Sequence, residues 1–284
     1  MTHLLPRRLA VPLAACLLAV CCLAAAHARA DLLDDVKKKG EIVIGTEAAF
    51  PPFEFVEDGK IVGYSADLLE LVMKDLPGVK VRRLDIPWQG ILPGLAAGKF
   101  DYIVTSVTAT KERSERYALS LPIADATVAL LVKADSAIKT PDDAAGKTVA
   151  SQTGSAQLQA LKGLDEKLKS AGKGLGQIRE YVGFDEAYAD LAAGRVDAVA
   201  QSFPNLADAV KKRPDTFRII TPPFGPKVYF SWAARKDADS KSLAAFFDAG
   251  LKKLNESGKM KELQVKWFGF EMPVPADALP EPVQ

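Results

Sequence analysis

The sequence predicts an α/β fold of two lobes, each a mainly parallel sheet with helices on its faces, and two observations lead to this. From residue 41 onward, short apolar runs alternate with segments of helical spacing in β-α-β-α-β order. The segments LAAGKFDYIV (95–104) and LAAGRVDAVA (191–200) also align without gaps. Each has the pattern of a helix end, a glycine C-cap, a basic residue and a buried strand. The same αβ unit is therefore expected once in each lobe.

Residues 1–30 are predicted to be a secretory signal peptide that does not belong to the fold. Two arginines precede an apolar stretch that ends near Ala26, and residues 28–30 (Ala-Arg-Ala) have the small-x-small pattern of a cleavage site. A membrane anchor is one alternative, because the apolar stretch is close to spanning length. Lipoprotein processing at Cys16 is another, and it ranks lower because it would leave an apolar new N-terminus.

The composition excludes several kinds of chemistry. All three cysteines and both histidines lie within the predicted signal. The chain beyond it therefore has no residues for a disulfide framework, a cysteine nucleophile, a Ser-His-Asp triad or a His/Cys zinc site. The 37 basic and 36 acidic side chains nearly balance, which gives no basic surplus for nucleic acid. No phosphate-binding loop of the GxxxxGKS type is present, and neither a cofactor nor a metal is expected.

In the first half of the chain, glycines and short polar segments separate helices from strands. Gly40 and Gly98 are suited to end two helices as C-caps. Asp58-Gly59 is typical of a hairpin turn. We expect helices at 31–40, 65–76 and 88–98, strands at 41–47, 79–84 and 102–104, and a loop with two aromatic residues at 48–53.

The second half repeats this order. Pro141 opens a short helix, and Thr153-Gly154-Ser155 turns into a longer one. The proline-rich tail after residue 270 is expected to be loosely held. We expect strands at 147–151, 177–182 and 227–236, and helices at 156–170, 185–194, 239–257 and 258–268.

The stretch from 101 to 122 carries the main candidate binding residue. Its strand ends in the hydroxyl cluster TSVT (105–108), Thr110 is suited to be the N-cap of a helix, and Arg113 lies just inside that helix. Ligands bind beyond the carboxyl ends of strands in open α/β sheets, and N–H groups, hydroxyls and a guanidinium together suit a carboxylate. The residues alone leave a second interpretation open, in which Arg113 pairs with Glu112 or Glu115 on a solvated face.

The chain resembles the periplasmic amino-acid-binding proteins of ABC importers, the polar-amino-acid solute-binding family. The resemblance covers nearly all of the chain beyond the signal, in GTEAAFPPFEF (45–55), GYSADLLE (63–70), WQGILPGLAAGKFD (88–101), TATKERSERYALSLP (108–122) and KMKELQVKWFG (259–269). It implies a type II periplasmic-binding-protein fold, in which two lobes joined by two crossing hinge strands close on a ligand in the cleft between them. It places lobe 1 at 31–125 and 229–284 and lobe 2 at 126–228, with crossings near 123–127 and 226–230.

The same resemblance implies a set of ligand-binding residues. Arg113 matches the arginine that clamps the ligand's α-carboxylate, and Glu47 matches an acidic position that reads the far end of the ligand. The other positions match aromatic walls (Phe50 and Trp88), carboxylate donors (Ser106 and Thr108), the lobe-2 loop that reaches the ligand (Gln152 and Ser155) and the lobe-2 strand end (Gln201 and Ser202).

Ser202 departs from the family pattern. The family usually has an aspartate there, which holds the α-ammonium of the ligand, and a serine has no charge to offer. Ala156 also stands where a threonine or glycine is common. We therefore expect ordinary L-α-amino acids to bind poorly, because the ligand either lacks a free α-ammonium or carries its amine near Glu47. The alternative is that another acid, Asp185 or Glu186, takes the place of the missing aspartate.

The function implied by the resemblance is that of a monomeric periplasmic binding protein. It would deliver an amino acid or a related small carboxylate to an ABC permease in the inner membrane, and it would not bind nucleic acid. The alternative is a periplasmic enzyme on the same scaffold, because cyclohexadienyl dehydratases resemble this family and Glu47 is an acid that can be placed in the cleft. A role as the binding partner of a sensory receptor fits the same residues.

Overall fold

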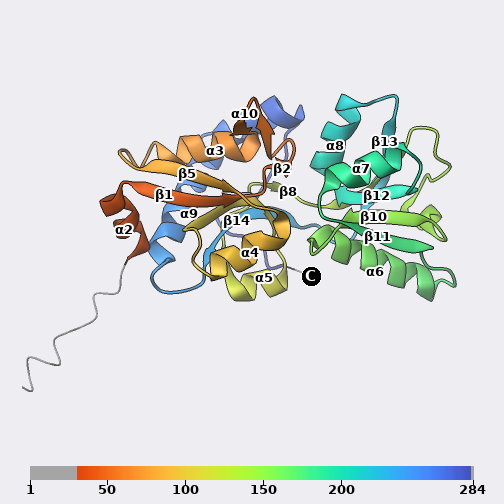
Figure 1. Cartoon of the computed structure of the whole chain (residues 1–284), viewed down its shortest axis with the longest axis horizontal. Coiled ribbons are helices and arrows are strands. Elements are labelled where there is room, and N and C mark those ends of the chain that lie inside the picture. The colour runs from red at the N-terminus through yellow and green to blue at the C-terminus, as the bar shows by residue number, and fades with distance from the viewer. Residues whose placement is uncertain (1–30, 283–284) are drawn as a thin grey trace, which may run out of the picture. The chain divides into compact units, whose positions relative to one another are not determined.

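The computed structural model describes residues 31–282, which build two lobes around two separate sheets (Figure 1). The predicted signal peptide and its alternatives fall on residues outside this range. Between residues 31 and 282, no helix has the length and apolar character needed to cross a membrane.

The first sheet has the strand order β5-β1-β6-β14-β7, with β8 paired to β14. Its strands are β1 (Glu41–Thr46), β5 (Lys80–Asp85), β6 (Tyr102–Thr108), β7 (Tyr117–Leu119), β8 (Ala124–Asp125) and β14 (Tyr229–Arg235). β1 is parallel to β5 and β6, whereas β14 is antiparallel to β6, β7 and β8. A small antiparallel sheet of β2 (Ala49–Phe50), β3 (Glu54–Glu57) and β4 (Lys60–Val62) belongs to the same lobe.

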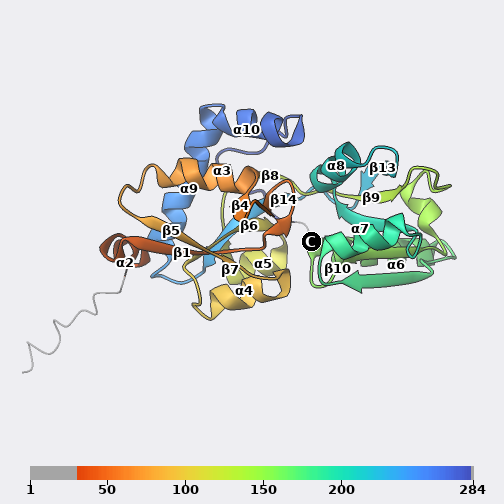
Figure 2. The same ribbon diagram turned by 45° about the horizontal axis from the view of Figure 1, so that its top comes forward.

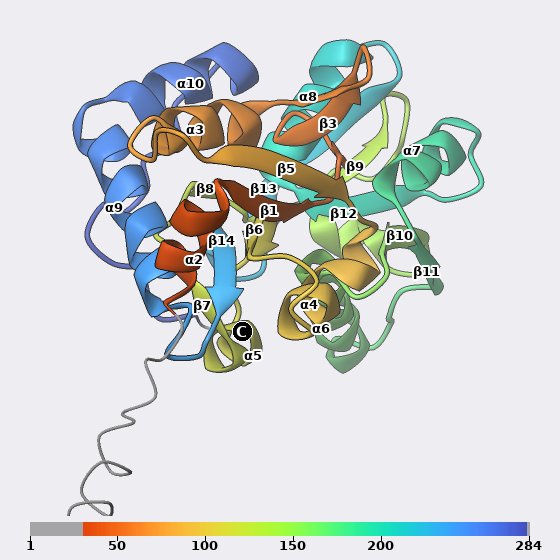
Figure 3. The ribbon, with the colours of Figure 1, turned by 60° about the vertical axis from the view of Figure 1, so that its left-hand side comes forward.

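Helices cover both faces of the first sheet (Figure 2). They are α2 (Leu32–Lys39), α3 (Tyr64–Met73), α4 (Trp88–Ala96), α5 (Lys111–Arg116), α9 (Lys241–Glu256) and α10 (Lys259–Phe268). Because strand side chains alternate between faces, β6 contributes to two cores. Tyr102 stacks on Phe247 of α9, with 3.9 Å between ring centroids, whereas Ile103 packs with Ile91 of α4. α10 packs beside α3 and α9 (Figure 3).

The second sheet has the strand order β11-β10-β12-β9-β13. Its strands are β9 (Val128–Lys133), β10 (Thr148–Gln152), β11 (Gln177–Tyr181), β12 (Ala198–Ser202) and β13 (Phe217–Phe224), and its helices are η1 (Pro141–Ala144), α6 (Ala156–Ser170), α7 (Phe184–Ala192) and α8 (Phe203–Lys212). Val149 faces the core under α6, where Leu161 lies, and the next residue, Ala150, faces the core that includes Ala187 of α7. Helices therefore cover both faces of this sheet too.

The chain passes between the sheets twice, from β8 to β9 and from β13 to β14. β10 is parallel to β11 and β12, but β9 is antiparallel to both of its neighbours. The two sheets are therefore mixed, and the expectation of mainly parallel sheets is wrong for β9 and β14. Each of these strands enters its sheet from the other lobe, at the end where the parallel strands finish. The lobe limits at 125/126 and 228/229 stay a prediction.

The internal repeat occupies corresponding places in the two lobes. The Asp101 carboxylate accepts a 2.8 Å hydrogen bond from Val43 N–H at β1, and the Asp197 carboxylate accepts a 2.8 Å hydrogen bond from Thr148 N–H at β10. Each aspartate thus fixes the start of the strand that follows it, β6 or β12, against the first parallel strand of the same sheet, β1 or β10. The prediction of one αβ unit in each lobe is confirmed.

The C-terminal tail is held more firmly than its prolines suggest. Gln264 of α10 donates its side-chain amide to Met272 C=O at 3.0 Å and accepts from Met272 N–H at 2.9 Å. Met272 is buried, and Asn255 of α9 donates to Val274 C=O at 3.2 Å. The expectation of a loose tail is therefore wrong for this part, because side chains of α9 and α10 hydrogen-bond the backbone of Met272 and Val274.

Candidate functional site

Arg113 is positioned by the start of α5. The Thr110 side chain caps this helix by accepting from Arg113 N–H at 3.3 Å. The guanidinium donates through Nη1 to Thr108 C=O at 3.0 Å and through Nη2 to Gly154 C=O at 3.4 Å. It also lies over the Trp88 ring, 4.8 Å from the centroid. Arg113 therefore contacts the end of β6 in lobe 1 and the turn before α6 in lobe 2.

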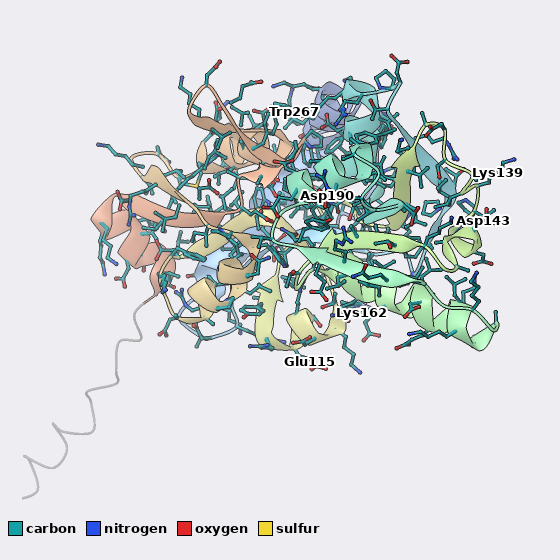
Figure 4. The ribbon with its side chains drawn as sticks, turned by 45° about the vertical axis from the view of Figure 1, so that its right-hand side comes forward. Glu115, Lys139, Asp143, Lys162, Asp190 and Trp267 are labelled. Carbon is teal, nitrogen blue, oxygen red and sulfur yellow. The ribbon has the colours of Figure 1, made fainter. Side chains whose placement is uncertain are left out.

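The charge of Arg113 has no carboxylate partner within residues 31–282. Glu112 is exposed and pairs with Arg116 at 3.3 Å, and Glu115 on the same helix (Figure 4) makes no ion pair with Arg113. The Arg113 side chain is only 9% exposed, and this burial lowers its pKa to about 10. The interpretation as a solvated surface pair is therefore wrong. A buried cation without a counter-ion is costly, so this site favours an anion.

Glu47 lies between the lobes, directly after β1. Its Oε1 accepts a 2.6 Å hydrogen bond from the Gln152 amide at the end of β10, and the same amide nitrogen donates to Val182 C=O at 3.1 Å. Burial raises the pKa of Glu47 to about 8; the Gln152 hydrogen bond opposes this shift, and the charge of Glu54 adds to it. Glu47 is thus a largely protonated acid at neutral pH that contacts both lobes.

The two predicted aromatic walls, Trp88 and Phe50, each touch the second lobe. Trp88 Nε1–H donates to Gly154 C=O at 3.1 Å. The Phe50 ring packs against Phe184 of α7, with 5.9 Å between centroids, and edge-on against Phe230 at 5.7 Å. Both side chains are buried, so they contribute apolar surface where the lobes meet.

Of the two predicted carboxylate donors on β6, Ser106 is engaged within the protein. Ser106 N–H donates to Glu54 Oε1 at 2.8 Å, and the Ser106 hydroxyl lies 3.4 Å from Glu54 Oε2. Thr108 is buried, and its carbonyl accepts from Arg113. Sequence reasoning missed Glu54. An acid within the otherwise apolar run FPPFEF is the signal that could have indicated it.

The lobe-2 loop is held by a helix cap. Ser155 is the N-cap of α6: its hydroxyl accepts from Leu158 N–H at 3.0 Å and donates to Gln152 C=O at 2.7 Å. The hydroxyl thus fixes the turn that presents Gln152 to Glu47. Ala156, the other position that departs from the family pattern, is buried at the first residue of the helix.

The lobe-2 strand end is closed by neutral hydrogen bonds. The fully buried Ser202 hydroxyl accepts from the Gln157 amide at 2.8 Å and donates to Ala126 C=O at 3.1 Å. The Gln201 amide oxygen accepts from Ser202 N–H at 2.7 Å. Gln157, on α6, was not among the predicted residues, and it satisfies the serine that replaces the expected aspartate.

Two further side chains join the lobes around this region. Gln89 of α4 donates to the carbonyls of Thr153 and Val182, each at 3.2 Å, and Asn205 of α8 donates to Pro51 C=O at 2.8 Å. A cavity of about 310 Å³ adjoins Arg113 and is lined by Trp88, Gln89, Leu92, Pro93, Glu112, Arg116, Tyr117 and Gly154. Among the described residues, no group of three or more His, Cys, Asp or Glu side chains could hold a metal ion.

Comparison with known proteins shows which family this chain belongs to. Residues 42–270 match the family described as "Bacterial extracellular solute-binding proteins, family 3". The L-cystine-binding protein TcyJ of Escherichia coli K12 is 30% identical over 244 residues, which cover 85% of this chain and 87% of that protein. The match therefore spans nearly all of the described fold.

Solved structures are similar over a comparable length. A P235GK mutant of ArgBP from T. maritima has a TM-score of 0.72 and 33% identity, with 84% of this chain and 99% of that chain covered. The ancestral amino-acid-binding protein AncCDT-1, described as a precursor of cyclohexadienyl dehydratase, has a TM-score of 0.73 and 31% identity, with 84% and 100% covered. The predicted two-lobe fold is confirmed by this likeness and by the two sheets.

Proposed function

Because the chain belongs to the bacterial extracellular solute-binding proteins of family 3, we propose that it captures an amino acid or a related small carboxylate and delivers it to the permease of an ABC importer. The ligand lies between the lobes, and its carboxylate pairs with Arg113. The observation that carries this proposal is the buried guanidinium of Arg113, which has no carboxylate partner within residues 31–282 and touches both lobes. An anionic ligand supplies the missing partner and links the lobes at the same time.

The remaining predicted residues take roles around that carboxylate. Phe50 and Trp88 supply apolar and aromatic surface, and Glu47 with Gln152 faces the end of the ligand that lies away from Arg113. Ser202 offers no charge to an α-ammonium, and its hydroxyl is already bonded on both sides. The ligand therefore lacks a free α-ammonium, as in a keto acid or an N-substituted amino acid, or it carries its amine where Glu47 lies.

A thermal-shift screen tests the proposal. The protein is heated with each of the twenty amino acids, L-cystine, opines and simple keto acids, because a ligand that binds only the folded form raises the unfolding temperature by mass action. We expect at least one carboxylate to stabilise the wild type and to lose that effect in Arg113→Ala. Stabilisation that is equal in wild type and Arg113→Ala would contradict the assignment of the carboxylate to Arg113.

A second candidate function is an elimination enzyme on the same scaffold. Two observations favour it: Glu47 is a buried acid whose raised pKa keeps it protonated near neutral pH, and AncCDT-1 is described as a dehydratase precursor. We prefer the binding function, because residues 31–282 contain no histidine or cysteine to share proton transfer. Mass spectrometry after incubation with prephenate or arogenate separates the two: unchanged substrate supports the binder, and turnover that Glu47→Gln abolishes supports the enzyme.

Export and oligomeric state complete the proposal. We propose a monomer in the periplasm that is released by cleavage after Ala30. Intact-mass analysis of protein recovered from the periplasm tests the cleavage, since a start at Asp31 supports it and a lipid adduct at Cys16 indicates lipoprotein processing instead. Light scattering on the purified protein tests the monomer. Uptake of the best ligand by cells with and without the gene separates transport from a purely sensory role.

A further inference from the structure

Glu54 is a buried acid whose carboxylate accepts hydrogen bonds from β6. Burial raises its pKa, and the nearby Ser65 hydroxyl on α3 acts to lower that pKa. Glu54 begins β3 and is 1% exposed. Its Oε1 accepts from the Thr105 hydroxyl at 2.7 Å and from Ser106 N–H at 2.8 Å, and Oε2 lies 3.4 Å from the Ser106 hydroxyl. These donors lie in the middle and carboxyl half of β6, the strand that ends next to Arg113.

Thr105 extends this contact to a third strand. Its hydroxyl oxygen accepts from Glu47 N–H at 3.4 Å while its hydrogen is donated to Glu54. The Glu54 carboxylate therefore holds β6 directly and holds the backbone at Glu47 through Thr105. Of the charged side chains, Glu47 after β1 and Arg83 on β5 lie close enough that their own pKa values respond to Glu54.

We propose that Glu54 is a positioning residue of the ligand site, which occupies the strand-end donors of Thr105 and Ser106 and thereby leaves Arg113 as the group that receives an incoming carboxylate. Because Glu54 belongs to the protein, it accepts from the Thr105 hydroxyl and from the Ser106 N–H and hydroxyl whether or not a ligand is bound. We expect this part of β6 to keep the same geometry in both states. When it is ionised, the Glu54 carboxylate also disfavours a ligand with a second carboxylate at this end. This inference rests on the proposed function only in assuming that a ligand binds here, because the contacts of Glu54 exist without one.

Chemical rescue tests whether the carboxylate itself does this. Glu54→Ala removes a group the size of acetate and leaves three donors without a partner. We expect Glu54→Ala to unfold at a lower temperature than the wild type and sodium acetate to raise that temperature by several degrees more than sodium chloride at the same ionic strength. Glu57→Ala, on the same strand but exposed, is the matched control and should show no acetate-specific effect. Equal responses of the two variants to acetate would overturn the proposal.

A spectroscopic measurement separates positioning from a merely structural role. Burial raises the pKa of Glu54 to about 7, so the Ser106 amide proton that it accepts should shift with pH around that value. Nuclear magnetic resonance in a Glu47→Gln background should show the amides of residues 106 and 47 moving in one transition. Glu54→Gln, which preserves the shape if Glu54→Ala does not fold, should abolish it. A Ser106 amide that titrates unchanged in Glu54→Gln would contradict the proposal.

These results do not depend on the identity of the ligand. If no amino acid or carboxylate stabilises the protein but acetate rescues Glu54→Ala, the proposed transport function fails while the role of Glu54 in ordering the strand end stands. If a ligand binds through Arg113 but Glu54→Gln alters neither its affinity nor the Ser106 resonance, the positioning role fails and the transport function stands.

Discussion

The ends of β6 in lobe 1 and β12 in lobe 2 occupy corresponding places in the internal repeat, but charged side chains surround the first and only neutral groups contact the second. At the end of β6, the donors of Thr105 and Ser106 surround a buried carboxylate, and the buried cation Arg113 follows. At the end of β12, Ser202 is bonded to an amide and a carbonyl, and no charge is present in those contacts. One copy of the αβ unit thus carries charge at its tip, and the other is neutral.

The difference shows that two copies of one αβ unit can share the hydrogen bonds that hold the fold and differ in the residues around the strand tip. Both units keep the same anchors. An aspartate just before β6 or β12 accepts a hydrogen bond from the first strand of its lobe, and a hydroxyl on that first strand donates to the later one, in Thr46 to Val104 C=O and Ser151 to Ala200 C=O, both at 3.0 Å.

The two charged side chains at the lobe-1 tip come from outside the strand, Glu54 from β3 and Arg113 from α5, and the contacts of Ser202 contain no such charge. The shared hydrogen bonds therefore set the scaffold, and we expect the residues around the strand tips to set the ligand preference.

Removing the charge at the lobe-1 tip should have the strongest consequence. Arg113→Ala should weaken binding of the best ligand at least a hundredfold by calorimetry, since losing one partner of a buried charge pair costs roughly 3–5 kcal/mol. Arg116→Ala, one turn further along α5 and exposed, is the matched control and should change the affinity less than threefold. Similar losses in both variants would mean that the ligand does not select the buried guanidinium.

The second prediction concerns the acids at the lobe-1 tip and pH. Burial raises the folded-state pKa of Glu47 to about 8 and that of Glu54 to about 7, above their usual value of 4.5. The folded protein therefore binds more protons than the unfolded chain between these values, and its free energy of unfolding should fall as pH rises from about 4.5 to about 8. Urea unfolding across this range should show the decline, and Glu47→Gln should remove part of it. A flat profile would mean that these carboxyls are not buried as described.

The third prediction adds the missing charge to the lobe-2 tip. Ser202→Asp should tighten binding of ordinary L-α-amino acids about tenfold, which is about 1.4 kcal/mol, because a carboxylate there can pair with an α-ammonium. Gln157 can still donate to it. Ser202→Ala is the control that removes the hydroxyl without adding charge. The interpretation of Ser202 is wrong if the wild type binds a standard amino acid below micromolar concentrations and Ser202→Asp does not improve it.

The fourth prediction compares the shared anchors. Asp101→Ala should lower the free energy of unfolding by about 1–3 kcal/mol, because it leaves the Val43 N–H without its partner. Asp197→Ala should cost less, since Asp197 is exposed and water can replace the lost bond to Thr148. Chemical denaturation of the two variants measures both. Equal costs would show that the anchors do not differ in burial.

The weakest of the expected changes is optical. Trp88 lies against Arg113 and donates to Gly154, so ligand binding should change its fluorescence. Trp88→Phe should abolish most of that change. Trp232 is fully buried within lobe 1, and Trp267 on α10 (Figure 4) donates to Asp67, so neither should respond to the ligand. An unaltered signal in Trp88→Phe would place the reporter at one of these.

The elements that the sequence pattern misses have a common reason. β13 contains Pro222 and Pro223, which normally argue against a strand, and it is tolerated because it lies at the edge of its sheet. α8 begins at Phe203 directly after β12, because Ser202 is both the last residue of the strand and the N-cap of the helix, so no loop separates the two elements. β9 and β14 run antiparallel to their neighbours because the chain enters them from the other lobe. Local periodicity contains no information about the direction of entry.

The order of residues along the chain was enough to predict the two αβ units, from helix spacing, a glycine cap and a buried strand within about ten residues. The local pattern left Arg113 open between a ligand clamp and a surface pair; the family resemblance favoured the clamp, which stays a prediction. Which donors stay free depends instead on the folded arrangement. Glu54 reaches Ser106 across 52 positions of the chain, and Gln157 reaches Ser202 across 45. These pairs depend on how the strands and helices pack, because a buried donor hydrogen-bonds an acceptor that lies next to it in the folded protein, however distant in sequence.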